Sequence, residues 1–256
     1  MIDLMALLEL YNTYSHDDIF YEIARNILNH YNELELNSLN DFADSLHVSP
    51  SSLNRFLKQL YYDNFTTFRQ EHLKREEYCL FDHLRIPGRS ARTGTLADFT
   101  AAFVASVTEQ LATVEQSGLD ALLRKLRERE NIIFVGIPMP SEVWWLQLEL
   151  VLLGKRTCAF LDPNCQAEAV MNCAPGDLVV GVDVVRQDDI FLDRALEIAR
   201  ERGADTACVS HAAKPGMAQR VNLFLSYDGV NTRADQATLA VVLNYLGHAL
   251  RGGAAQ

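Results

Sequence analysis

Apolar positions between residues 38 and 61 recur with a helical period in two short runs. The first run places Leu39, Phe42, Ala43 and Leu46 on one face, and the second places Leu53, Phe56, Leu57 and Leu60 on one face. Apolar residues at i, i+3, i+4 and i+7 are the signature of an amphipathic helix. A tight break at residues 47–50 separates the two runs. Two helices of this length joined by such a turn predict a helix-turn-helix.

The second of these helices offers a polar face of the kind that contacts DNA. Ser51 and Ser52 stand where an N-cap is favoured, and Ser49-Pro50 disfavours helix just before that point. Short polar groups and cations are the types that reach base edges and phosphates. The predicted DNA-contacting residues are Ser49, Ser51, Ser52, Asn54, Arg55 and Lys58. On the pattern alone, a pair of helices that only packs within an all-α domain stays an alternative.

Helical periods on both sides of the helix-turn-helix place an all-α domain at residues 1–84. Residues 85–95, RIPGRSARTGT, contain proline and glycine without apolar periodicity and are predicted to be a linker. The arginines of this linker either contact DNA phosphate or keep the segment solvated. Residues 96–129 have the pattern of helix, with a break expected near Gly118.

After residue 130 the pattern changes to short apolar runs separated by helical stretches. The runs lie at residues 131–136, 157–161, 178–182, 206–209 and 223–225. Strands that are apolar throughout and alternate with helices are typical of a parallel sheet buried on both faces. Residues 96–256 are therefore predicted to form a C-terminal α/β domain with a doubly wound, five-stranded parallel sheet.

Motifs in both halves match known families. The pattern FA..L.VSPSS..RF.K.L, followed by F..F, resembles the N-terminal domain of RpiR-type transcriptional regulators. The second half carries FVG at the end of its first strand, then PGDLVVGV, LEIARERGA and NTRADQATLAVVLNYL. With these motifs it resembles the sugar isomerase (SIS) domain. A helix-turn-helix followed by such a domain is the RpiR architecture. The two resemblances together cover nearly the whole chain.

An open α/β sheet binds ligands beyond the carboxyl ends of its strands, where the strand order reverses. The ligand-binding candidates are Gly136, Ser141, Asp183, Arg186, Gln187 and His211. The resemblance implies phosphosugar-binding loops rich in glycine and serine at 136–141 and 183–189, and the chain departs from both. Pro138 and Pro140 lack an N–H, Glu142 repels phosphate, and Asp183 stands about where a phosphate-binding serine is expected.

Other residues near the predicted strand ends have two interpretations each. Arg186 restores a phosphate contact as a forked donor, or it pairs with the aspartates of its own loop. His211 and Lys214 line the ligand site or belong to a surface loop. Thr232-Arg233 faces the site or caps the last helix. Adjacent helix positions cannot both face inward, so of Trp144 and Trp145 one is expected in the core and the other at a subunit contact.

Composition narrows the classes of function. The 256 residues are 48% hydrophobic and 22% charged, as in a globular protein, and the net charge of −11 does not suit a non-specific nucleic-acid binder. The basic residues of the helix-turn-helix region form a small local footprint, so DNA binding is expected to depend strongly on salt. Five scattered cysteines without metal-like spacing, and the lack of a signal or membrane-spanning segment, indicate a cytoplasmic protein without metal or cofactor.

These observations predict a DNA-binding transcriptional regulator that is not an enzyme. Its expected partners are double-stranded DNA, a phosphosugar or another small-metabolite effector, and a further copy of itself in a homodimer or homotetramer. Two alternatives remain. The chain is a phosphosugar isomerase-like enzyme in which Glu142, Asp183 or His211 acts as a base. Otherwise it is a regulator whose SIS-like domain only dimerises.

Overall fold

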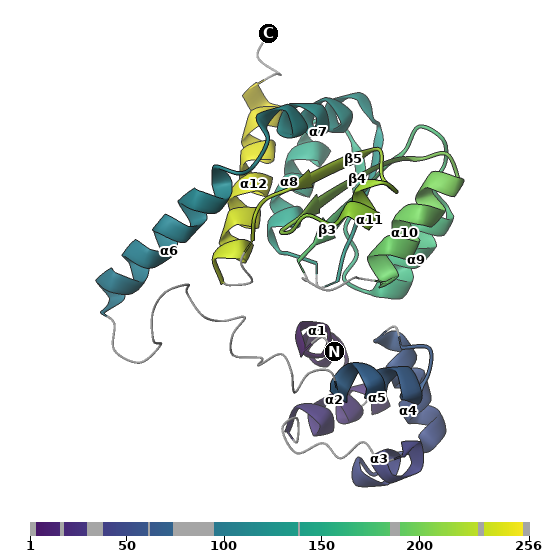
Figure 1. Ribbon diagram of the computed structural model, residues 1–256. Helices are drawn as coiled ribbons and strands as arrows, with labels where there is room; N and C mark the ends of the chain where they lie inside the picture. The colour runs from purple at the N-terminus through teal and green to yellow at the C-terminus, as the bar shows by residue number, and fades with distance from the viewer. Residues whose placement is uncertain are drawn as a thin grey trace. The chain divides into compact units, whose positions relative to one another are not determined.

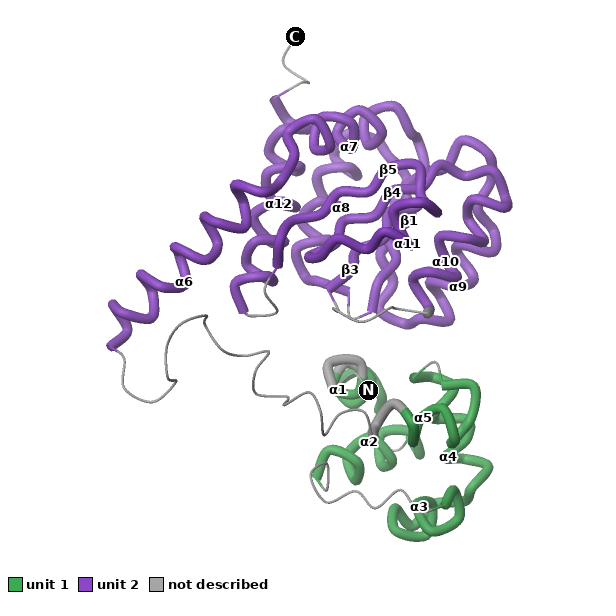
Figure 2. Tube along the Cα trace, viewed as in Figure 1, with its two compact units in different colours: residues 1–80 green, residues 81–256 purple. Residues whose placement is uncertain are grey.

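The structure is a computed structural model that describes residues 4–15, 18–29, 38–60, 62–73, 95–137, 139–184, 190–229 and 233–252. The chain forms two compact units, Met1–Leu80 and Phe81–Gln256 (Figure 2). The predicted linker, apart from Thr95, lies outside the described residues, so the predicted domain bounds of 1–84 and 96–256 stay predictions.

The N-terminal unit is helical, as the apolar period predicted. Its helices are α1 (Leu4–Thr13), α2 (Ile19–Asn29), α3 (Leu39–Ser45), α4 (Pro50–Gln59) and α5 (Phe65–Leu73) (Figure 1). Phe42 of α3, Phe56 of α4 and Phe68 of α5 are fully buried. The rings of Phe42 and Phe68 stack with their centroids 5.7 Å apart. These aromatic contacts join α3 and α5 in one core and so fix the faces that the helices turn to solvent.

The C-terminal unit contains a sheet of five parallel strands with the order β2-β1-β3-β4-β5, which confirms the predicted fold class. The strands are β1 (Asn131–Val135), β2 (Arg156–Cys158), β3 (Leu178–Asp183), β4 (Asp205–Ser210) and β5 (Leu223–Ser226). The helices are α6 (Leu96–Leu111), α7 (Gln116–Glu128), α8 (Glu142–Leu152), α9 (Pro163–Met171), α10 (Ile190–Glu201), α11 (Pro215–Ala218) and α12 (Arg233–Gly252). The strand order reverses between β1 and β3.

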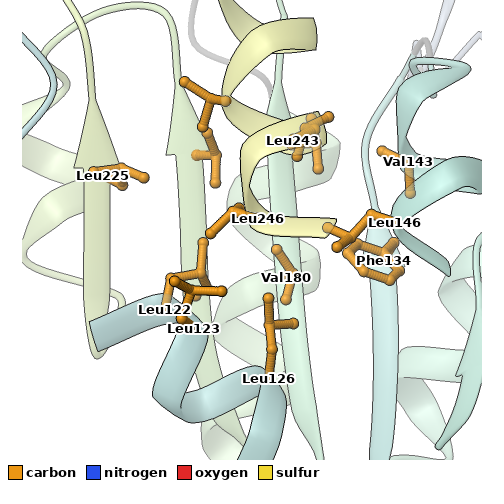
Figure 3. Close-up of a cluster of buried hydrophobic side chains, with 14 of the residues drawn as sticks. Leu122, Leu123, Leu126, Phe134, Val143, Leu146, Val180, Leu225, Leu243 and Leu246 are labelled. Atoms are coloured by element: carbon orange, nitrogen blue, oxygen red, sulfur yellow. The ribbon is translucent and has the colours of Figure 1, made fainter. Parts of the chain in front are cut away.

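Alternation along the strands produces one core on each face of the sheet. Successive strand side chains point to opposite faces, so Phe134 and Val180 meet α7, α8 and α12, whereas Val135 and Val179 meet α9 and α10. Leucines of α7 and α12 fill the first core, among them Leu122, Leu126 and Leu246 (Figure 3). Because both faces are covered, the strands are apolar throughout, and this is the pattern that identified them in the sequence.

Two local details differ from the sequence prediction. The break in the helical segment 96–129 lies at residues 112–115, and Gly118 is inside α7. A Cβ atom at Gly118 would lie 2.8 Å from Cδ1 of Leu225, so this glycine lets α7 pack closely against β5. The short helix α11 was not predicted, and Pro215 occupies its first turn.

Among the helices that the structure describes, none is long and apolar enough to span a membrane.

Candidate functional site

The helix-turn-helix is defined by serine caps on both of its helices. The hydroxyl of Ser38 accepts a hydrogen bond from the Asp41 amide at 3.1 Å and caps α3. The hydroxyl of Ser49 accepts one from the Ser52 amide at 3.1 Å and caps α4. The sequence placed this second cap at Ser51 or Ser52, which is wrong. Pro50 takes the first helical position, where its missing N–H costs nothing, so the helix begins earlier.

The turn between α3 and α4 contains a strained residue. His47 has φ of 56°, a left-handed conformation that residues other than glycine rarely adopt. The amide of His47 donates to the Asp44 carbonyl, and that of Val48 donates to the Ala43 carbonyl, each at 3.0 Å. This is the Schellman motif, which usually places glycine where His47 lies. The turn therefore keeps its geometry through hydrogen bonds in spite of an unfavourable residue.

His47→Gly should stabilise the N-terminal unit by roughly 0.5–1 kcal/mol, because glycine adopts the left-handed conformation without steric cost. The measurement is thermal unfolding of the variant followed by circular dichroism. Ser45→Gly is the matched control, since Ser45 lies within α3, where glycine lowers stability by a similar amount. A variant with unchanged or lower stability would show that His47 makes compensating contacts.

The polar face of α4 is accessible, as the predicted role requires. Leu53, Phe56 and Leu57 are buried in the core. The predicted DNA-contacting residues lie on the remaining surface: Ser49, Ser51, Arg55 and Lys58 are exposed, and Ser52 and Asn54 are partly exposed. Ser49 also serves as the cap, and its hydroxyl lies 2.9 Å from the hydroxyls of Ser51 and Ser52. The structure thus brings these six residues together at the start and on one side of a single helix.

Gly136, at the end of β1, is held by internal hydrogen bonds. Its amide donates to Oε1 of Gln166 at 2.9 Å, and its carbonyl accepts from Nε2 of Gln166 at 3.1 Å. Gln166 is fully buried, and no motif in the sequence marks it. A Cβ atom on Gly136 would lie 2.4 Å from the Val182 carbonyl oxygen, so only glycine permits this approach of β1 to β3. The amide predicted to meet a ligand therefore already has an acceptor.

Asp183, the last residue of β3, belongs to a buried ion pair. Its Oδ2 lies 2.7 Å from Nζ of Lys214 and accepts a hydrogen bond from the Ser210 hydroxyl at 2.7 Å. Asp183 and Ser210 are fully buried, and Lys214 is 9% exposed. The pairing of β3 with β4 sets Asp183 beside Ser210, and Lys214 follows just before α11. The interpretation of Lys214 as part of a surface loop is wrong, because its ammonium group turns inward to the carboxylate.

His211 is also buried, at 3% exposure, and therefore is not a surface-loop residue. Its Nδ1 lies 3.4 Å from the Asp183 carbonyl oxygen, while Nε2 finds no hydrogen-bond partner among the residues that the structure describes. Burial lowers the pKa of His211, against the opposing effect of the Asp183 and Asp235 carboxylates. The imidazole next to the Asp183–Lys214 pair is therefore favoured in its neutral form.

A second polar cluster lies beside His211, at the start of α12. Gln110 of α6 donates to Asp235 at 2.7 Å and accepts from the Thr238 hydroxyl at 2.6 Å. The Tyr227 hydroxyl donates to the carbonyl of Asp235 at 2.6 Å. Sequence reasoning missed this cluster, because its members come from α6, from the residue that follows β5 and from α12, and they share no motif. Their hydrogen bonds hold α6 against the amino end of α12.

The other candidates are more exposed or lie outside the described residues. Ser141 is exposed at the start of α8, and its hydroxyl donates to Glu142 at 3.2 Å. Arg233 is exposed in the first turn of α12. Arg186 and Gln187, together with Pro138 and Thr232, lie outside the described residues. The structure therefore places Asp183 and His211 next to each other. That any of these candidates contacts a ligand stays a prediction.

Helix α8 exposes a continuous apolar stripe, which we term the α8 surface. Its members are Trp144, Trp145, Leu148, Val151 and Leu152, between 44% and 70% exposed. They recur at helical spacing, opposite the buried stripe of Val143, Leu146 and Leu150. The expectation that one of the two tryptophans lies in the core is wrong, because those three residues already fill the inward positions. A large exposed apolar patch marks an interaction site.

Comparisons with known proteins agree with this architecture. No protein-family model matches the chain. An uncharacterized HTH-type transcriptional regulator in the aarA 3′ region of Providencia stuartii is 19% identical over 208 residues, which are 80% of this chain and 73% of that protein. The solved structure of the Vibrio vulnificus NanR protein complexed with ManNAc-6P matches with a TM-score of 0.55 at 17% identity. That match covers 98% of this chain and 91% of that one.

The sugar isomerase domain of an RpiR transcription factor from Sphaerobacter thermophilus also matches, with 22% identity and a TM-score of 0.49 over 59% of this chain and 86% of that one. The NanR match spans both units of the chain. The predicted architecture, in which a helix-turn-helix precedes a parallel α/β sheet domain, is thereby confirmed at the level of the fold.

Proposed function

We propose that this protein is a DNA-binding transcription regulator whose α/β unit responds to a sugar phosphate or a related metabolite. The observation that carries the proposal is α4, whose apolar face is buried while its serines, Asn54, Arg55 and Lys58 are accessible on the other side. In a helix-turn-helix the second helix enters the major groove, where such groups contact bases and phosphates. The likeness to NanR and to the Providencia regulator supports the same function.

The test of DNA binding is selection of genomic fragments by the purified protein at low and at moderate salt. Recovery of a few fragments that share an inverted repeat supports the proposal, because the two helix-turn-helix units of a dimer contact the two halves of a two-fold site. Recovery of random fragments that dissociate with salt, or of none, would leave the helix-turn-helix as a packing module.

Arg55→Ala should weaken binding of the selected site by about 1–3 kcal/mol if the guanidinium reads a base, with relaxed preference at that base pair. If Arg55 contacts phosphate, affinity should fall evenly for all sequences. Arg124→Ala is the matched control, because it removes one charge from an exposed position of α7 in the other unit. Affinity titrations at constant salt measure both variants. If Arg55→Ala binds DNA with the affinity of the wild-type protein, Arg55 does not belong to the DNA interface.

A dimer that uses the α8 surface completes the proposal. Two copies of this apolar stripe cover each other across a two-fold axis, and the pair of α/β units then sets the distance between two helix-turn-helix units. An effector that prefers one such distance changes DNA affinity.

The alternative of an isomerase has less support from the described geometry. Asp183 is fully buried and paired with Lys214, so its carboxylate is poorly placed to accept a substrate proton. His211 is 3% exposed. A catalytic base must reach the proton that it abstracts, and neither side chain is open to solvent in this arrangement.

A further inference from the structure

The carboxyl ends of β1, β3 and β4 lie side by side, and four hydrogen-bond donors that the structure describes near them have acceptors within the protein. The Gly136 amide donates to Gln166, and the Ser141 hydroxyl donates to Glu142. The Ser210 hydroxyl and the Lys214 ammonium group both meet Oδ2 of Asp183 at 2.7 Å. Amides, hydroxyls and an ammonium group are the groups with which proteins hold phosphate.

Asp183 occupies the centre of this arrangement. Its side chain is fully buried, and its Oδ2 forms an ion pair with Lys214 and accepts a hydrogen bond from the Ser210 hydroxyl. A buried carboxylate needs a charged partner of this kind, because an isolated charge in the protein interior is strongly disfavoured. A phosphate that reached Lys214 would have to displace the Asp183 carboxylate or stand beside it. Displacement leaves the buried carboxylate without its cation, and the second arrangement places two anions in contact.

We infer that the Asp183 carboxylate takes the place of a ligand phosphate at this strand-end site, so that the site excludes phosphorylated ligands and any effector bound there lacks a phosphate group. The inference rests on the proposed function only in taking this edge of the sheet as the metabolite site. Of the two classes of effector in the proposed function, it excludes sugar phosphates and keeps related metabolites that lack a phosphate group. Lys214 and Ser210 keep a latent capacity to bind phosphate, which removal of the carboxylate exposes.

The experiment measures the melting temperature of the full chain with increasing inorganic phosphate and, separately, with ManNAc-6P, against sodium chloride of equal ionic strength. The wild-type protein should show no saturable rise. Asp183→Ser, which removes the carboxylate and leaves space, should gain a rise that saturates with phosphate, since a ligand that binds only the folded state stabilises it. Asp183→Ser/Lys214→Met should lose this gain, because the cation is gone.

Two results would overturn the inference: a saturable rise for the wild-type protein with either compound, or a folded Asp183→Ser protein without any gain. If Asp183→Ser fails to fold, Asp183→Asn replaces it, since the amide has the same shape without the charge. The wild-type titration decides independently of both variants. Selection of genomic DNA uses the wild-type protein without phosphate. Loss of the proposed DNA-binding function would therefore be seen separately from loss of this inference.

Discussion

Lys214→Met should lower the free energy of unfolding of the C-terminal unit by about 3–5 kcal/mol, because it leaves the fully buried Asp183 carboxylate without the cation 2.7 Å away. Methionine keeps most of the volume of the lysine side chain, so the loss comes from the unpaired charge and not from a cavity. Urea unfolding followed by tryptophan fluorescence reports on this unit, since the two tryptophans of the chain are Trp144 and Trp145 of α8.

The double variant Lys214→Met/Asp183→Asn should recover much of the lost stability, because it carries neither buried charge; the resulting cycle measures the coupling of the pair. The matched control is Arg194→Met, which breaks the exposed ion pair of Arg194 with Glu197 and should cost far less stability, because solvent screens that pair. Equal losses for Lys214→Met and Arg194→Met would show that the Asp183–Lys214 pair contributes little to the fold.

Leu148→Asp should convert the proposed dimer to a monomer and weaken binding of an inverted-repeat DNA site by about 10²–10⁴-fold, the loss expected when two linked contacts become one. Leu148 lies in the middle of the α8 surface and is 44% exposed, so the carboxylate remains hydrated in the monomer but would be buried unpaired in the dimer. Light scattering gives the mass of the protein in solution, and a titration gives its affinity for DNA.

The matched control is Ala218→Asp, which adds the same charge at an exposed position of α11. The control should keep both the mass and the affinity of the wild-type protein. If Leu148→Asp remains a dimer of full affinity, the α8 surface has another partner, and the contact between copies lies elsewhere on the chain.

The two-part organisation was accessible from the sequence because it depends on local periodicity. A helix that is buried on one side repeats its apolar residues every three or four positions, and Leu53, Phe56 and Leu57 follow that rule. A strand that is buried on both faces is apolar throughout, and β3 is fully buried along its length. The caps were less predictable, since Ser49, Ser51 and Ser52 are chemically alike and only the position of Pro50 in the first turn selects Ser49.

The sequence by itself determined the class of fold, the positions of its strands along the chain and the strand ends at which Gly136 and Asp183 stand. Only the tertiary structure decided what those residues meet. Lys214 lies 31 positions after Asp183 along the chain, and Gln166 lies 30 after Gly136; no local pattern connects either pair. They come together because parallel strands bring their carboxyl ends to one edge, where a buried charge or amide must find a partner. That requirement, and not a motif, sets the chemistry of this edge of the sheet.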